Sequence, residues 1–227
     1  MAIYSLLAAI GCRTHEALQI RIDDIDVENR KIRLVNPFSR DNRGLTPEEV
    51  KQLNWKGRDT EKVLSIYPFD EHFWEHLRYY LQDFFRTNVS HDFLFQKVNG
   101  RPYFTTSRSD RNKQFRRYAV ASGFEGIKLG LHSLRHMYGR YLLNYYPNSN
   151  GGYGMSMQYV QKLMGHSSMN STKKYALHDE GLLEAYMETA NRLNHGEQIS
   201  LVEVKKRFVD TQIKELQNLK KELIQHV

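Results

Sequence analysis

The chain has 227 residues, enough to bury one sizeable core without a second globular unit. Its 33 Lys and Arg outnumber 26 Asp and Glu, and the formal charge of +7 is compatible with a polyanionic partner. The single cysteine, Cys12, excludes an intramolecular disulfide, and we expect a small buried side chain in a reducing cytoplasm. No apolar stretch approaches the length of a membrane span, and residues 1–10 lack the pattern of a signal peptide. The sequence therefore predicts a cytoplasmic protein with no membrane partner.

The first third of the chain mixes short helical and alternating segments. Residues 2–10 and 16–18 are expected to be helical on either side of Gly11, and residues 19–27 and 31–35 are expected to be strands joined by a turn at 28–30. A polar, irregular stretch at 36–58 leads to residues 62–67, which suit a third strand. These segments predict a small three-stranded antiparallel sheet.

From Asp70 onward the pattern is helical. Apolar side chains recur at helix spacing at Phe73, Leu77, Tyr80, Leu81, Phe84 and Phe85. Further helices are expected at 108–122, 132–145 and 157–164, with a surface loop at 147–154. The predicted fold class is α+β and mostly α-helical.

The last part of the chain divides at Gly196 into a helix at 181–193 and an amphipathic helical tail at 196–227. In the tail, Val202, Val209, Leu216 and Leu223 repeat every seven residues. Lys205 and Gln212 occupy other seam positions, which favours a helix that packs on a partner or on its own core over a coiled coil.

The string at residues 131–136 places His132 and Arg135 three residues apart, on one face of a helix turn. Such a pair could hold a phosphate, although taken alone it is more often a solvated or structural pair. His132 and His136 have the spacing of a zinc-binding helix, but the general-base Glu of the metalloprotease motif is absent. A guanidinium beside the site would also repel a cation. The sequence therefore predicts no metal.

A second string, residues 163–168, contains His166, which precedes Tyr175 by nine positions. On one unbroken helix nine residues turn by roughly 180° and advance about 13.5 Å, so the two side chains could not share a face. Tyr175 must therefore lie on a separate or displaced element, which suits a nucleophile on a movable segment. The alternative is a packing role, since the chain has 14 tyrosines.

Taken in order, residues 11–18, residues 132–136, and Gly165-His166 with Tyr175 resemble the signature boxes of the tyrosine recombinase and phage integrase family. The resemblance spans roughly residues 1–177, and Ala17 and Met164 are mild departures from the family pattern. It implies a tyrosine recombinase catalytic domain at residues 1–195. It also implies a site-specific recombinase, or integrase, that cleaves and rejoins DNA through a covalent 3′-phosphotyrosine.

The resemblance implies a set of catalytic residues that needs no cofactor. The set is Arg13, Lys56, His132, Arg135, His166 and Tyr175. Tyr175 is the nucleophile, the two arginines hold the phosphate oxygens, His132 accepts the tyrosine proton and His166 donates a hydrogen bond to the phosphate.

Lys56, in a Lys-Gly turn before the third expected strand, is assigned to protonate the 5′ oxygen as it leaves. Residues 38–53 look like an insertion in this hairpin, so Lys62 remains an alternative to Lys56.

The expected partner is double-stranded DNA at an attachment or recombination site, together with a synaptic tetramer to which the helix at 181–193 and the tail would contribute. Accessory DNA-bending proteins are a further partner class. The DNA-clamping domain and the start of the catalytic domain that precede the first box in the family are expected to be missing, which implies weak DNA binding by the chain alone.

Three other classes remain open. They are a type IB topoisomerase-like nicking-closing enzyme, an inactive DNA-binding relative, and a structural domain with chance motifs. The complete residue set argues against the second, and the order of the boxes argues against the third.

Overall fold

The computed structural model describes residues 1–58, 60–126, 129–147 and 153–173, and positions 206, 209, 210, 213 and 217. Tyr175, the helix expected at 181–193, the centre of the 147–154 loop and most of the tail lie outside the described residues. The described tail positions are helical, and among them Val209 and Ile213 are exposed.

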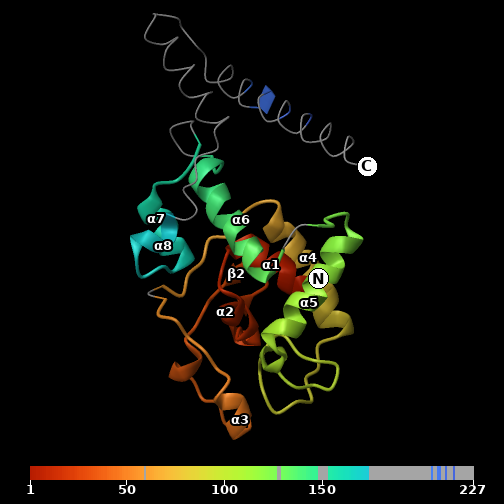
Figure 1. Cartoon of the computed structure of the whole chain (residues 1–227). Helices are drawn as coiled ribbons and strands as arrows, with labels where there is room; N and C mark the ends of the chain where they lie inside the picture. The colour runs from red at the N-terminus through yellow and green to blue at the C-terminus, as the bar shows by residue number, and fades with distance from the viewer. Residues whose placement is uncertain are drawn as a thin grey trace, which may run out of the picture.

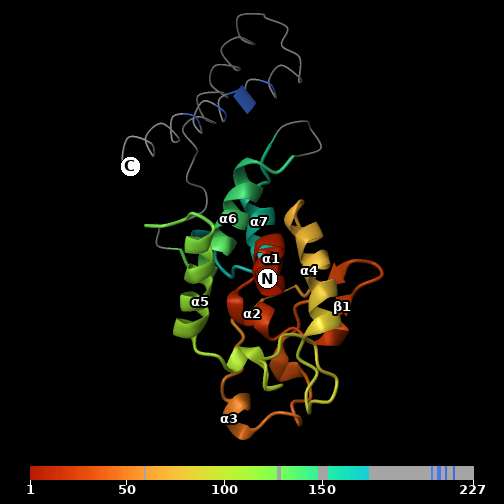
Figure 2. The same ribbon diagram turned by 90° about the vertical axis from the view of Figure 1, so that its right-hand side faces the viewer.

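Helix α1 (Ala2–Ile10) lies at the centre of the molecule and contacts both α4 (Phe69–Asp83) and α6 (Leu131–Asn144) (Figures 1 and 2). Its run of Ala and Leu favours a helix, and Leu6, Leu7 and Ile10 are fully buried. The helix ends at Gly11, whose left-handed φ of 55° is typical of a C-terminal cap. Cys12, which follows, is buried as predicted.

The sheet has two antiparallel strands, β1 (Ile25–Asp26) and β2 (Lys31–Ile32), in the register Ile25 to Ile32. The turn between them forms as predicted, but the expected third strand at 62–67 is wrong. After one antiparallel bridge between Arg33 and Lys62, the chain leaves the sheet. Its next backbone groups find other partners: the Leu64 carbonyl accepts from the Tyr138 hydroxyl, and the Ile66 N–H donates to the Ala9 carbonyl.

The strand expected at 19–27 is also shorter than predicted. The backbone of residues 20 and 22 hydrogen-bonds residues 94 and 92, and a 3₁₀ turn, η1 (Ile22–Asp24), follows. Only Ile25 and Asp26 are left to pair with β2. The segment predicted as one strand at 19–27 therefore bonds to two partners, first residues 92 and 94 and then β2.

The stretch at 36–58 is not wholly irregular. It contains a 3₁₀ turn, η2 (Pro37–Ser39), and a short helix, α3 (Pro47–Val50), which lies far from α6 and α7 (Figures 1 and 2). Thr46 and Glu49 form the capping box that begins α3: the Thr46 Oγ1 accepts from the Glu49 N–H, and the Glu49 carboxylate accepts from the Thr46 N–H.

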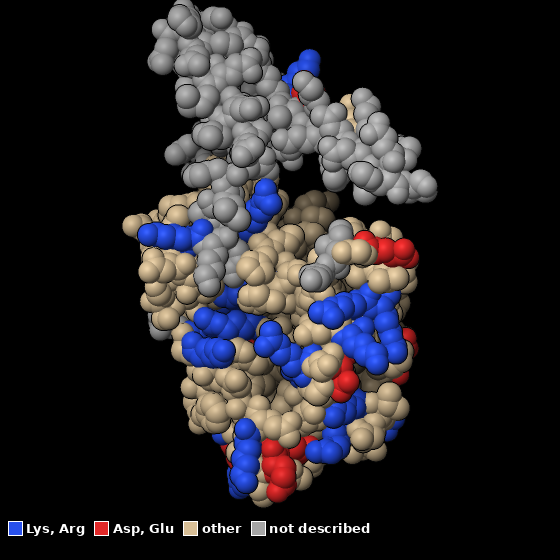
Figure 3. Space-filling view, viewed as in Figure 1, with Lys and Arg blue, Asp and Glu red and all other residues tan. Residues whose placement is uncertain are grey.

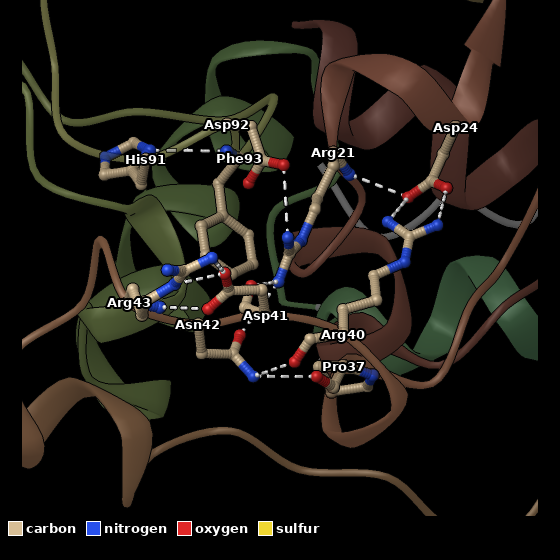
Figure 4. Close-up of polar contacts among 10 residues, drawn as sticks. All are labelled: Arg21, Asp24, Pro37, Arg40, Asp41, Asn42, Arg43, His91, Asp92 and Phe93. Carbon is tan, nitrogen blue, oxygen red and sulfur yellow. Dashed lines mark hydrogen bonds and ion pairs between the residues drawn. The ribbon is translucent and has the colours of Figure 1, made fainter.

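A network of arginines fastens this stretch to the body of the protein (Figure 4). Arg21 donates to Asp92, to the Asp41 carbonyl and to Asn42, and Arg40 forms an ion pair with the buried Asp24.

The remaining helices agree with the sequence predictions to within one or two residues at each end. They are α2 (Thr14–Leu18), α5 (Arg108–Ala121) and α7 (Met157–Met164). The short α8 (Met169–Lys173), which follows α7, was not predicted from the sequence. Helix α5 fully buries none of its residues. The partly buried Phe115 packs on the core, edge to face with Tyr4 at 5.2 Å between ring centroids, and Tyr118 meets the same ring at 5.9 Å. The polar sides of α5 are therefore left at the surface.

Candidate active site

A cleft of about 830 Å³ lies where α2, the turn at residues 54–56, α5, the start of α6 and the segment after α7 meet. Five of the six sequence-predicted residues line it: Arg13, Lys56, His132, Arg135 and His166. The sixth, Tyr175, lies outside the described residues and follows the end of α8 by two positions. Lys62, the alternative to Lys56, is not among the lining residues and lies at the bridge to Arg33.

The C-terminal end of α7 holds two arginines of the cleft, Arg13 and Arg135. Arg135 donates to the Gly11 and Met164 carbonyls, both at 2.7 Å, and Arg13 donates to the Gly165 carbonyl at 2.7 Å. Carbonyls at the end of a helix have no intrahelical partner and carry the negative end of its dipole, so they favour cations. The first and second boxes are thereby fixed to the two residues that precede His166.

Glu16 and Arg58 form a buried pair behind the cleft. The Arg58 guanidinium lies 3.3 Å from the Glu16 carboxylate, which also accepts from the Arg13 backbone and side chain at 2.7 Å. Burial opposes the charged form of Glu16, but Arg58 and the contacts with Arg13 outweigh it, so the pKa of Glu16 lies below its ordinary value. The carboxylate is therefore ionised at neutral pH and holds both arginines.

The two predicted histidines are neutral at physiological pH. Burial, then Arg135 and Arg13, lowers the pKa of His166 to about 3, and burial, then His136 and Arg135, lowers the pKa of His132 to about 4. One ring nitrogen of His166, Nδ1, lies 2.9 Å from the Thr172 hydroxyl of α8. A neutral imidazole keeps one nitrogen able to accept a proton, which is the state that a general base requires.

The cleft contains residues that the sequence prediction missed. Arg108, Arg111 and Arg116 of α5 form one wall, and His15 of α2 lines the floor. Helix α5 follows Ser107, and the Ser107 hydroxyl caps this helix by accepting a hydrogen bond from the Asp110 N–H. The concentration of Arg and Lys in residues 108–117 was a signal for a basic surface, and Figure 3 shows such a band crossing this face over α5.

Among the described residues, no cluster of three or more His, Cys, Asp or Glu could hold a metal ion. In the same part of the chain, no helix has the length and apolar character needed to cross a bilayer.

The sequence matches a family model described as the phage integrase family over residues 1–181. The tyrosine recombinase XerC of Staphylococcus carnosus is 22% identical over 192 residues, which are 84% of this chain and 53% of that protein. XerD of Haemophilus ducreyi is 24% identical over 181 residues, covering 77% of this chain and 48% of its own length. The chain thus spans about half the length of the curated relatives it matches.

Two solved structures have a similar fold. XerA recombinase aligns with a TM-score of 0.56 at 21% identity, covering 87% of this chain and 57% of that one. XerH site-specific recombinase, in a post-cleavage complex with its palindromic difH substrate, aligns with a TM-score of 0.56 at 23% identity, covering 82% of this chain and 44% of that one. The mostly helical architecture with its small sheet is therefore that of a recombinase catalytic domain.

Proposed function

Because the chain belongs to the phage integrase family, we propose that it carries the catalytic domain of a site-specific DNA recombinase that works through a covalent 3′-phosphotyrosine. The observation that carries this proposal is the cleft, where four separate chain segments contribute Arg13, Lys56, Arg135 and two neutral histidines. Cations and neutral bases around one concave site are what the attack of a tyrosine on a DNA phosphate requires.

In this proposal, Tyr175 Oη forms a bond to phosphorus while its proton passes to His132. Arg13 and Arg135 stabilise the charge on the non-bridging oxygens of the transition state, and His166 hydrogen-bonds the phosphate. An unperturbed tyrosine has a pKa near 10, so only about one in a thousand is ionised at neutral pH. The neutral imidazole of His132 and the nearby guanidiniums supply the help that the phenol needs.

The bond between phosphorus and the 5′ oxygen breaks as Lys56 gives that oxygen a proton. The phosphotyrosine keeps the energy of the phosphodiester, so a second 5′ hydroxyl can attack it and release Tyr175. Rejoining therefore requires no nucleotide cofactor.

We also propose the partners of this reaction. They are double-stranded DNA carrying a recombination site, further copies of the chain in a synaptic tetramer and, as a further class, accessory DNA-bending proteins. The basic band over α5 supports the first (Figure 3).

The activity is tested by incubating the full chain with a pool of duplexes of randomised sequence that carry a nick just 3′ of the cleaved bond. The short downstream fragment with the new 5′ hydroxyl then diffuses away, and the adduct is trapped. We expect a denaturant-resistant complex of protein and DNA, and sequencing of the trapped strands gives the target. Arg135→Ala should lower adduct formation by about 10²- to 10³-fold. No adduct with any duplex would contradict the proposal, and relaxation of supercoiled DNA without recombinant products would favour a nicking-closing enzyme.

A further inference from the structure

The turn that carries Lys56 is fastened at its first residue. The Asn54 N–H donates to Gln19 Oε1, and Gln19 Nε2 donates to the Asn54 carbonyl, both at 2.7 Å. Gln19 is buried directly after α2, so a side chain that follows the first box fixes the backbone two residues before Lys56. Two hydrogen bonds from one amide fix both position and orientation.

The other end of the turn is fastened by Arg58. Its guanidinium, which is fully buried, donates to the Leu163 carbonyl at 3.0 Å and to the Met164 carbonyl at 3.1 Å. The same group faces Glu16 at 3.3 Å. The turn is thereby joined to α7, whose C-terminal end leads to His166.

Lys56 lies between these two anchors. Its side chain is exposed and lines the cleft, while Gly57, with a φ of 60° and open space where a Cβ would lie, reverses the chain toward Arg58. The lysine side chain is long and flexible, so the position of its backbone sets the region that its amine can reach.

We infer that Gln19 and Arg58 are positioning residues for proton donation by Lys56 to the departing 5′ oxygen. The inference rests on the proposed function and concerns only the placement of the turn. Neither side chain touches the substrate: each acts through the backbone on one side of Lys56. A displacement of about 1 Å at a reacting group can cost about 10²-fold in rate, which is the effect that two anchors would prevent.

A leaving group that needs no proton separates this role from a general effect on folding. With a sulfur atom in place of the bridging 5′ oxygen, the tyrosine oxygen still forms its bond to phosphorus, and the bond that breaks is P–S. The thiolate leaves unprotonated, because a thiol, with a pKa near 8.5, is a far stronger acid than an alcohol hydroxyl. Cleavage of this substrate should not depend on Lys56 or on its placement.

The experiment compares cleavage rates on oxygen-bridged and sulfur-bridged versions of the nicked duplex recovered from the trapping pool. Lys56→Met should lose about 10²- to 10⁴-fold on oxygen and cleave the sulfur substrate at close to the parent rate. Gln19→Met should lose about 10- to 100-fold on oxygen and cleave the sulfur substrate at close to the parent rate. Arg58→Met also removes contacts with Glu16 and the end of α7, so it should lose some rate on both substrates and more on oxygen than on sulfur.

The matched control is Arg21→Met, which removes another buried arginine that fastens residues 41 and 42 and does not line the cleft (Figure 4). Any loss that it causes should be equal on the two substrates.

Equal losses on both substrates for Gln19→Met and Arg58→Met, or parent rates on both, would overturn the inference. If Arg58→Met does not fold, Gln19→Met decides alone, because it removes two hydrogen bonds and no charge. Failure of the proposed function looks different: the parent chain would form no adduct, or Lys56→Met would cleave oxygen normally.

Discussion

Arginine side chains join the chain segments at the centre of this molecule, because one guanidinium offers five N–H donors in a rigid plane. Arg13, Arg58 and Arg135 use this geometry to donate to the carbonyls of residues 163–165. Arg13 and Arg58 share the Glu16 carboxylate, and Arg135 lines the cleft. A lysine would supply the charge but could not bridge two carbonyls in fixed directions. The arrangement keeps several cations close together, and these add to burial, the larger cause, in lowering the pKa of the histidines beside them.

The histidines give the stability of the folded chain a pH dependence. His132 and His166 have pKa values of about 4 and about 3 in the fold, against roughly 6.5 in an unfolded chain. Between those values the unfolded chain binds the extra protons, so the free energy of unfolding is undiminished above about pH 6.5 and falls as the pH drops below it. Urea denaturation between about pH 6.5 and 5, above the range where carboxylates titrate, measures this.

In that window the double variant with His132→Gln and His166→Gln should show a flatter dependence than the parent. A variant whose unfolding free energy changed with pH as steeply as the parent's would rule out neutral, buried imidazoles as the cause.

The burial of Arg58 and its contacts could not be predicted from the sequence. Arg13, His132, Arg135 and His166 could be selected because they stand in short, ordered strings, and the structure gathers them in one cleft. The carbonyl partners of Arg58 are 105 and 106 positions away, and nothing in the residues around it indicates burial. An arginine in a polar turn is ordinarily exposed.

Among the elements, α1 and α6 set the position of the cleft through Gly11. Its carbonyl accepts from Arg135, and a Cβ built there would lie 2.1 Å from Tyr138 Cδ1. The close approach of the two helices, as well as the left-handed φ, therefore requires glycine.

Gly11→Ala should lower the free energy of unfolding by about 2–4 kcal/mol, combining a clash with an unfavourable backbone conformation. Gly123→Ala is the matched control, because Gly123 also has a positive φ but nothing within 4 Å of the added Cβ. It should cost only about 1 kcal/mol. Equal losses in chemical denaturation would show that helix approach is not the constraint at Gly11.

Most of the helices could be predicted from the sequence pattern, and the third strand could not. Long periodic segments predicted α4, α5, α6 and α7 because helical hydrogen bonds are local. The third strand failed because strand pairing depends on distant partners, and here Tyr138 and Ala9 take the backbone groups that a ladder would use. The start of helix α3 could have been predicted, because Thr46-Pro47 followed by Glu49 is the pattern of a capping box, although the surrounding stretch looked irregular.

On the face of the molecule drawn in Figure 3, basic side chains gather over α5 and around the cleft. Each phosphate neutralised by a cation steepens the salt dependence of DNA affinity by about 0.9 in a plot of log K against log salt. Arg108→Gln, at an exposed residue lining the cleft, should reduce that slope by about one unit.

Arg43→Gln is the control, because Arg43 is highly exposed but does not line the cleft, and its slope should match the parent's. Fluorescence anisotropy on a labelled duplex over a range of salt concentrations makes the comparison. A slope that Arg43→Gln changes and Arg108→Gln does not would place the DNA on another face.

The proposed mechanism depends most on Tyr175, the one predicted catalytic residue outside the described part of the chain. The ending of α7 at Gly165 and the separate helix α8 agree with the expectation that Tyr175 does not continue the helix before His166. The most direct measurement is mass spectrometry of the protease-digested adduct trapped on a nicked duplex. The account predicts a nucleotide linked through its 3′ phosphate to Tyr175, and no adduct for Tyr175→Phe. An adduct on another residue, or one that still forms with Tyr175→Phe, would contradict it.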